Sequence, residues 1–280
     1  MNLGCNTPRV TACEPADLVD HDRYPVDRLD SPDGRALVDH CAAQLRETGA
    51  CELPGFLTTA GLDAALADAC ALEPLAYRSG GLGTAYLASP PDDLPDEHPR
   101  RWRGPHAVGV VAYDQFPAES PIRQLYEWGP LREFLAAVLG HDVLHPYADP
   151  FGALNLAVMA DGDELQWHFD MTDFVVSLAL RDAEAGGDFE TVPRIRSHDA
   201  ENYEHVAEVL AGDNRDVVTI EMSPGTLLLF EGRHSLHRVS PISGPTTRLV
   251  ALLAYDTKPG TCGSATLARH RYGRVTPLHR

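Results

Sequence analysis

The segment Gln166–Asp170 carries an imidazole and a carboxylate two positions apart, at His168 and Asp170. Residues i and i+2 of a strand share a face, so this spacing places both groups at one point. In a chain with 13 histidines and many acidic residues, about one such triplet is expected by chance. The triplet therefore needs a second group of ligands before it predicts a metal site.

A second histidine-containing segment, Gly232–Pro241, supplies that group with His234 and His237. In a regular strand these two side chains lie on opposite faces, because they are three residues apart. His237 shares its face with Val239, and the family resemblance described below favours His237 as the ligand. His234 remains the alternative.

Arg248 lies inside the apolar run Thr247–Tyr255, which predicts a strand. A guanidinium in the middle of such a strand is costly to bury unless an anion meets it. Its partner is either a ligand carboxylate or an acidic residue of the protein itself.

Two imidazoles and one carboxylate are the ligand set of the facial triad, which leaves three positions open on Fe(II). A 2-oxo acid chelates two of them and dioxygen takes the third. The remote carboxylate of that acid then needs a fixed bidentate cation, a role for Arg248 on the neighbouring strand. The residues predict iron held by His168, Asp170 and His237, with a 2-oxo acid bound at Arg248.

The pattern of the chain changes from helices to short strands near its middle. Pro-rich and Asp-rich residues 1–30 predict an arm, and the glycines and prolines of residues 79–105 predict a long surface loop. Helical spacing covers residues 37–45, 59–69, 122–126, 131–139 and 203–211. Short β-like runs cover residues 153–160, 174–180, 189–192, 217–222, 226–230 and 247–255. This order predicts a mainly β, α+β fold built on an antiparallel sandwich or barrel.

Composition excludes several classes of protein. The chain has 280 residues with 41 acidic and 23 basic groups, a formal net charge of −18 that makes nucleic acid or an anionic membrane an unfavourable partner. No apolar run approaches the roughly 18 residues that span a bilayer, and the start lacks a signal peptide pattern. Six cysteines without a CxxC pair predict neither a disulfide framework nor a zinc site. We expect a cytoplasmic protein with a small-molecule partner.

The order His168, Asp170, His237, Arg248 resembles the Fe(II)/2-oxoglutarate-dependent oxygenase superfamily, in which a distal His and then an Arg follow an HxD triplet. Within it, the chain is most similar to the group that modifies free amino acids, which comprises hydroxylases and halogenases. The similarity covers roughly residues 105–260. Its motifs are Val111–Asp114, Asp149-Pro150, Leu154-Asn155, Gly162–Asp170, Gly186–Glu190, Pro224–Thr226 and Gly232-Arg233.

The resemblance implies a double-stranded β-helix, that is, a jelly-roll (cupin-like) core, with helices on its outer sheet and the metal in its mouth. Residues 1–280 then form a single catalytic domain. Its parts are the arm 1–30, helical support and active-site loops at 31–145, the core at 146–260 and a C-terminal tail or lid at 261–280.

The resemblance also implies the cofactors Fe(II), 2-oxoglutarate and O2, and hydroxylation of an unactivated C–H bond with release of succinate and CO2. Halogenating members have a small residue where this chain has Asp170, so the hydroxylase branch is favoured. The acidic surface favours a basic amino acid such as lysine, ornithine or arginine. The alternatives are desaturation, cyclisation or epimerisation at the same metal, or a jelly-roll protein that binds a ligand without turnover.

Further contacts are predicted from position alone. Asn155 lies on a predicted strand where related enzymes place a contact to the co-substrate, although a satisfied sheet amide explains it equally well. Candidate substrate contacts are Trp167, Arg103, Arg78, Asp149 and Tyr272. A core aromatic explains Trp167 and solvated surface positions explain the others, and the sequence does not indicate an oligomeric state.

Overall fold

The computed structural model describes residues 14–279, so the first thirteen residues of the predicted arm lie outside the described part. Its helices are α1 (Pro15–Leu18), α2 (Pro32–Thr48), α3 (Thr59–Leu72), α4 (Pro121–Glu127), α5 (Gly129–Leu139), α6 (Tyr203–Leu210) and α7 (Ala265–Tyr272). Short 3-10 turns occupy Glu73–Leu75, Pro99–Arg101 and Tyr113–Gln115. None of the helices within residues 14–279 combines the length and the apolar character that crossing a membrane requires.

The strands form one curled antiparallel sheet and one small pair. They are β1 (Ala50–Leu53), β2 (Tyr77–Thr84), β3 (Arg103–Val111), β4 (His145–Pro146), β5 (Leu154–Met159), β6 (Leu165–His168), β7 (Val175–Arg181), β8 (Phe189–Val192), β9 (Val218–Ile220), β10 (Leu227–Phe230), β11 (Leu236–Val239), β12 (Arg248–Leu253) and β13 (Tyr255–Asp256). The order in the large sheet is β1-β10-β7-β12-β5-β3-β6-β11-β8-β9, with β2 beside β3, while β13 pairs with β4. Because β3 pairs with both β5 and β6, it joins the two halves of the roll.

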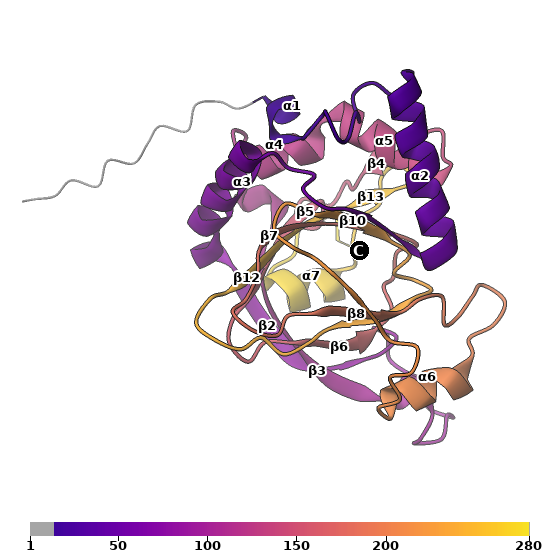
Figure 1. Ribbon diagram of the computed structural model, residues 1–280. Coiled ribbons are helices and arrows are strands. Elements are labelled where there is room, and N and C mark those ends of the chain that lie inside the picture. Colours follow the sequence, from indigo (N-terminus) through magenta and orange to yellow (C-terminus); the bar gives the residue numbers. More distant parts are fainter. Residues whose placement is uncertain (1–13, 280) are drawn as a thin grey trace, which may run out of the picture.

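Two layers of sheet face each other across the molecule (Figure 1). Helices α1 to α5 cover the outer side of the layer that contains β5, β7, β10 and β12, and α6 lies beside the layer that contains β6 and β8. Alternation along β5 divides its side chains between two cores, since Leu156 packs under the helices and Ala157 faces the inside. The jelly-roll prediction is confirmed.

Local sequence signals fix the ends of the covering helices. The Ser31 hydroxyl accepts the Gly34 N–H at the start of α2, and Gly49 ends that helix in the left-handed conformation at φ 75°. The Thr58 hydroxyl accepts the Gly61 N–H at the start of α3. Helix α2 is thus longer than the predicted range 37–45, and α3 begins at the predicted residue 59.

Residues 79–105 do not form the single long loop that we predicted. Strand β2 pairs with β3 along its whole length, from Tyr77 opposite Val110 to Thr84 opposite Arg103, and only residues 85–102 connect the two. The expected tail at 261–280 likewise contains helix α7, which lies between the two sheet layers (Figure 1). Both elements border the site described next.

Candidate metal centre

Two strands bring the histidines together. His168 ends β6, His237 lies on β11, and the antiparallel register places the two residues directly opposite each other. Both side chains are buried, and their ring centroids are 4.3 Å apart. Phe230 and Phe189 pack against the His237 ring, with centroids at 5.0 Å and 5.6 Å. The pair of imidazoles is therefore held rigidly by the sheet and by aromatic packing.

Backbone carbonyls orient both imidazole rings. Nδ1 of His168 lies 2.7 Å from the Gln166 oxygen, and Nδ1 of His237 lies 2.9 Å from the Ser235 oxygen. A carbonyl only accepts, so each Nδ1 carries the proton and donates it. The lone pair of each Nε2 is then free to bind a metal ion. Hydrogen bonds of this kind from Nδ1 fix the tautomer and the orientation of histidine ligands.

Asp170 completes a group of three. It follows β6 directly, and its Oδ2 lies 3.3 Å from Nε2 of His237. This oxygen is buried yet has no hydrogen-bond partner among the described residues. One ligand atom from each of His168, Asp170 and His237 lies within 4.8 Å of the others. Two imidazoles and a carboxylate with an unsatisfied oxygen fit a divalent transition metal in a facial site.

The protonation state of His168 suits metal binding. Burial lowers the pKa of this imidazole well below its ordinary value, and the neighbouring His237 and His106 lower it further. A metal binds the neutral imidazole, so these surroundings keep His168 in the form that binds.

Gly232 allows Asp170 to approach the histidines. The Asp170 N–H donates to the Gly232 carbonyl at 3.0 Å, and a Cβ built on Gly232 would lie 2.0 Å from Oδ2 of Asp170.

We expect Gly232→Ala to displace the carboxylate and weaken Fe(II) binding by about 10–100-fold, the usual effect of losing support for a ligand. Anaerobic calorimetric titration with Fe(II) measures this. Gly129→Ala is the control, because only Glu133 comes within 4 Å of its Cβ, at 3.9 Å. An unchanged Fe(II) affinity in folded Gly232→Ala contradicts the assignment of Asp170.

Arg248 begins β12 on the inner face and is 6% exposed. Within residues 14–279, no hydrogen bond or ion pair is made by its guanidinium. Burial lowers its pKa to about 10, while Asp182 and Asp188 act in the opposite direction from a distance. An unpaired buried guanidinium is costly, which indicates a site for an anion.

A cavity of about 380 Å³ borders Arg248. Its lining includes Phe189, whose ring packs against His237, and the acidic side chains of Asp182, Glu184, Asp188 and Glu221. The three candidate metal ligands do not line it. The Cβ of any residue at Gly187 would lie 2.9 Å from Cδ of Arg248. The glycine at this position therefore leaves room for the guanidinium beside the cavity.

His234, the alternative ligand, lies in the turn before β11 rather than in the strand. Trp167, a predicted substrate contact, faces away from His168, because neighbouring residues of a strand point to opposite sides. Its ring packs in a separate core with Leu236, and the Arg238 guanidinium covers it at 4.7 Å from the ring centroid. Trp167 therefore packs as a core aromatic.

The two predicted arginine contacts lie elsewhere on the rim. Arg78 forms an ion pair with the buried Asp163, which ties β2 to the loop before β6. Arg103 begins β3 and is exposed. The contacts of the described residues do not connect either side chain to the three metal-site residues.

Asn155, predicted as a contact to the co-substrate, makes hydrogen bonds within the protein. Its amide nitrogen donates to the carbonyls of Phe151 and Leu154 at 2.7 and 2.8 Å. Its oxygen accepts the Tyr272 hydroxyl at 2.9 Å. All these atoms are buried, so the amide joins α7 to the inner wall of the roll. The structure thus brings Asn155 and Tyr272 together, but as a structural pair.

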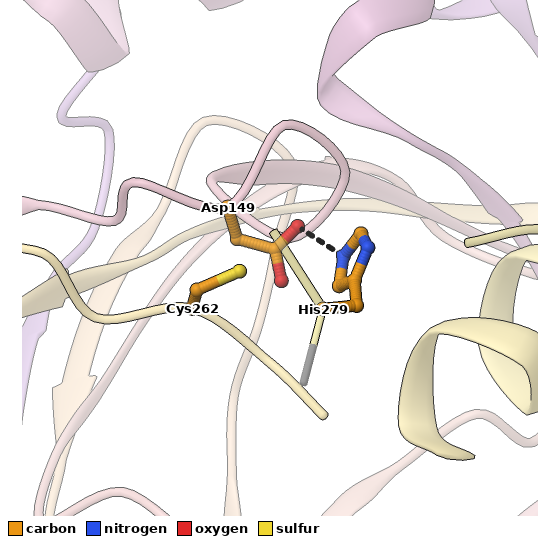
Figure 2. Close-up of side chains that lie close together, drawn as sticks. All are labelled: Asp149, Cys262 and His279. Atoms are coloured by element: carbon orange, nitrogen blue, oxygen red, sulfur yellow. Dashed lines mark hydrogen bonds and ion pairs between the residues drawn. The ribbon is translucent and has the colours of Figure 1, made fainter. Parts of the chain in front are cut away.

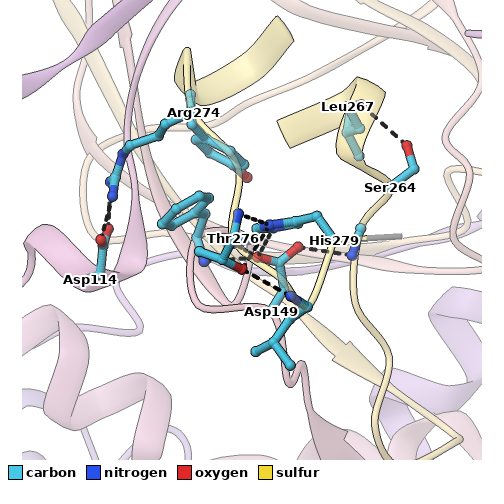
Figure 3. A network of polar contacts seen from close by, with 12 residues as sticks. Asp114, Asp149, Ser264, Leu267, Arg274, Thr276 and His279 are labelled. Atoms are coloured by element: carbon cyan, nitrogen blue, oxygen red, sulfur yellow. Dashed lines mark hydrogen bonds and ion pairs between the residues drawn. The ribbon is translucent and has the colours of Figure 1, made fainter. Parts of the chain in front are cut away.

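Asp149 belongs to a second cluster, with Cys262 and His279, which we call the C-terminal clasp (Figure 2). Oδ1 of Asp149 accepts Nε2–H of His279 at 3.1 Å and two backbone N–H groups, while Oδ2 accepts the Gly263 N–H at 2.9 Å. Nδ1 of His279 accepts the Thr276 N–H at 2.9 Å, so the imidazole proton is on Nε2 (Figure 3). The carboxylate and imidazole already bind each other, which makes the clasp a structural anchor.

The clasp gives stability a pH dependence. Burial raises the pKa of Asp149, but its backbone hydrogen bonds and His279 outweigh burial, and the pKa is lowered from 3.8. A lowered carboxyl pKa contributes stability that is complete above the unfolded pKa and is lost as the pH falls through the folded pKa. We expect Asp149→Asn to lower the free energy of unfolding at pH 7 by about 1–3 kcal/mol, with the difference from wild type shrinking below about pH 4. Urea unfolding at several pH values measures this, with the exposed Asp142→Asn as the control. A difference that stays constant down to pH 2 refutes the role given to the charge.

Sequence reasoning missed His106, on β3. Its ring lies edge-on to His168, with centroids 5.2 Å apart, and its Nε2 is buried without a partner. Nδ1 lies 3.2 Å from the Gly104 oxygen, so this nitrogen carries the proton and Nε2 is an acceptor. Recognition of β3 as a strand would have placed His106 opposite Leu165 of β6 and so beside the site.

Comparisons with solved structures agree with this fold. The non-heme alpha-ketoglutarate-dependent epimerase SnoN from nogalamycin biosynthesis is 18% identical, with a TM-score of 0.57 over 88% of this chain and 92% of that one. AviO1 from Streptomyces viridochromogenes is 19% identical, with a TM-score of 0.54 over 80% and 96%. A 2OG-Fe(II) oxygenase-family oxidoreductase from Burkholderia pseudomallei is 17% identical, with a TM-score of 0.50 over 80% and 92%. At these identities the likeness shows the fold.

The family comparison is more specific. No curated protein matches the chain significantly. The family model described as Halogenase D, in contrast, matches residues 102–269. This match spans more than half of the chain and includes β3, both histidine strands and Arg248. The chain therefore belongs to the Halogenase D family.

Proposed function

We propose that this protein is an Fe(II)/2-oxoglutarate-dependent oxygenase that hydroxylates an unactivated C–H bond of a free amino acid. The observation that carries the proposal is the unpartnered Oδ2 of Asp170 beside His168 and His237. Fe(II) bound by these three residues supplies the activation of O2, coupled to oxidative decarboxylation of 2-oxoglutarate to succinate and CO2.

The chain's own residues hold and orient the reactants. The Nδ1 hydrogen bonds of His168 and His237 keep both Nε2 atoms aimed at the metal position. Arg248 binds the remote carboxylate of 2-oxoglutarate through charge-assisted hydrogen bonds. Helix α7 lies against the inner wall of the roll and limits the access of water to the mouth, which protects a reactive site from side reactions.

Asp170 favours hydroxylation over halogenation. The family name describes a halogenase, and the sequence resemblance implies that halogenating members carry a small residue at this position so that a halide can bind the metal. A carboxylate occupies that position here. We therefore propose hydroxyl transfer as the outcome and keep halogenation as the second candidate, which the family match favours.

The substrate class is proposed from the net charge of the protein. A net charge of −18 produces a field that attracts cations, which favours a basic amino acid such as lysine, ornithine or arginine. The same field disfavours nucleic acid as a partner. We place the reaction in the cytoplasm.

The test is an anaerobic preparation with Fe(II) and 2-oxoglutarate, exposed to air with each of the free L-amino acids in the presence of chloride. Succinate and product masses are measured. Hydroxylation adds one oxygen atom, whereas desaturation or ring closure removes two hydrogens, epimerisation leaves the mass unchanged, and chlorination replaces hydrogen by chlorine. Absence of succinate with any substrate indicates a binding protein and refutes the proposal.

A further inference from the structure

The position of Asp170 depends on loop contacts rather than on the sheet. Strand β6 ends at His168, which the register with β11 places opposite His237. Asp170 lies two residues beyond the strand, where its N–H donates to the Gly232 carbonyl at 3.0 Å. Gly232 belongs to the turn at residues 232–234 that leads into β11, which we call the ligand turn. The place of the carboxylate therefore depends on how the end of β6 and the ligand turn are held together.

Arg196 binds the ligand turn from the segment that follows β8. Its backbone N–H donates to the His234 carbonyl at 3.3 Å, and its Nε donates to the Arg233 carbonyl at 2.7 Å. A single residue thus binds two consecutive carbonyls of the turn. The carbonyl just before them, that of Gly232, accepts the Asp170 N–H. Arg196 therefore fixes the turn next to the group that holds Asp170.

The same guanidinium covers Phe169, the residue between the two ligands of the HxD triplet. Cζ of Arg196 lies 3.9 Å from the centroid of the Phe169 ring, and that side chain is 1% exposed. Tyr86 also packs against the ring, with centroids 5.2 Å apart. A cation is attracted to an aromatic face, and the attraction is stronger where water is excluded. The Arg196 side chain is itself only 12% exposed, so this contact holds Phe169 in place.

The segment that carries Arg196 is fixed as well. Nη1 of Arg196 pairs with the Glu201 carboxylate at 3.1 Å, which balances the charge of the guanidinium. The Asn202 side-chain amide donates to the Ile195 carbonyl at 2.9 Å and closes the segment. A group that positions a ligand must have its own place determined by packing and hydrogen bonds. Arg196 meets that requirement.

The shape of a guanidinium explains why an arginine serves here. It is planar, so its face can lie on an aromatic ring while its edge donates hydrogen bonds in the plane. Arg196 uses the face for Phe169 and the edge for the Arg233 carbonyl and the Glu201 carboxylate. Methionine has a side chain of similar reach that covers the ring but donates nothing. Lysine keeps the charge without the planar fork.

We propose that Arg196 is a positioning residue of the metal centre, which joins the HxD segment to the ligand turn and thereby sets the place of Asp170. This inference rests on the proposed function, because it takes Asp170 to be a ligand of Fe(II). The effect passes through Asp170, since the register of β6 with β11 already holds His168 and His237. Loss of Arg196 then weakens the contribution of the carboxylate and leaves the two imidazoles in place.

Arg238 provides a matched control. Its guanidinium covers Trp167, the residue that precedes His168 as Phe169 follows it, with Cζ 4.7 Å from the ring centroid. It pairs with Glu190, as Arg196 pairs with its own carboxylate. Arg238 and Trp167 both lie within paired strands, however, so the sheet keeps their neighbours in register. Removal of Arg238 therefore takes away a similar contact without releasing a metal ligand.

The experiment measures metal affinity by anaerobic calorimetry with Fe(II), and the geometry of the metal from the visible absorption of the Co(II)-substituted protein. The proteins are wild type, Arg196→Met, Arg196→Lys and the control Arg238→Met. A second set combines Asp170→Ala with and without Arg196→Met. Thermal unfolding of each metal-free protein shows that it is folded and how much stability the substitution costs.

We expect Arg196→Met to weaken Fe(II) binding by about tenfold or more and to change the Co(II) spectrum, in line with the loss of support for a ligand. Arg196→Lys retains part of the affinity, and Arg238→Met binds both metals as wild type does. In the Asp170→Ala background, Arg196→Met causes less than about a twofold further loss, because both substitutions act on the same ligand.

Wild-type affinity in either folded Arg196 variant overturns the inference. An equal loss with and without Asp170 also overturns it, and so does failure of both variants to fold, because Arg196 then supports the fold as a whole. Wild type that binds no Fe(II) refutes the proposed function together with the inference. Wild type that binds Fe(II) independently of Arg196 refutes the inference alone.

Discussion

We expect Asp170→Gly to abolish hydroxylation and to weaken Fe(II) binding by more than about 100-fold. Loss of a residue that only supports a metal ligand costs up to about 100-fold, and loss of the ligand itself costs more. The reason is the geometry of Oδ2, which is buried, 3.3 Å from Nε2 of His237, and bound to no protein donor. Its removal takes away the anionic ligand while His168 and His237 keep their places, because the β6–β11 register holds them.

The measurement is anaerobic Fe(II) titration together with product analysis in the presence and absence of chloride. Asp173→Gly is the matched control, because Asp173 is an exposed acid three residues away that pairs only with Arg233. Retained hydroxylation in Asp170→Gly contradicts the ligand assignment. A chlorinated product from this variant would show that the carboxylate alone separates this chain from halogenating relatives.

Arg248→Ala lowers the affinity for 2-oxoglutarate by about 100-fold and leaves Fe(II) binding nearly unchanged. A bidentate pair between a buried guanidinium and a carboxylate is worth several kcal/mol once both are desolvated, and it is lost as a whole. Because Arg248 has no partner within the described residues, its removal also leaves the unliganded protein as stable as wild type or more so.

Arg181→Ala is the matched control for this variant. Arg181 lies on β7 next to β12, but its guanidinium is bound to Glu73 and Thr247. Its loss therefore lowers the melting temperature without a specific effect on 2-oxoglutarate. Calorimetry and thermal unfolding distinguish the two outcomes, and an Arg248→Ala variant that loses Fe(II) and 2-oxoglutarate equally shows that Arg248 is structural.

The outer helices and most strands could be predicted because local signals specify them. Ser31 and Gly49 mark the ends of α2 through cap chemistry that depends only on neighbouring residues. The strands of the core carry continuous apolar runs such as Leu227–Phe230, which predict burial on both faces. Local chemistry and tertiary structure agree at these positions.

The elements that border the mouth could not be predicted in the same way. Strand β2 contains Gly80 and Gly81 and forms through pairing with β3, which follows it only after the connecting residues 85–102. Helix α7 buries only two of its side chains, Ala268 and Tyr272, so its apolar pattern is weak. Tertiary contacts rather than propensity stabilise both, and His106 was missed because it lies on β3, the strand that pairs with β2.

The candidate metal-site residues, in contrast, could be selected from the sequence. His168, Asp170, His237 and Arg248 were identified as one set because metal chemistry restricts residue type and order, even where no strand had been located. Asn155 and Trp167 were chosen from position alone, and both have partners within the protein. Chemical constraint on a set of residues was more informative than the position of a single residue.

Anaerobic calorimetry with Fe(II) followed by 2-oxoglutarate tests the metal centre most directly. We predict a single Fe(II) per wild-type chain and 2-oxoglutarate binding that requires the metal. We also expect His237→Ala to lose both, while His234→Ala, in the preceding turn, retains both. Equal Fe(II) binding by wild type and His237→Ala, or tight 2-oxoglutarate binding without metal, would contradict it.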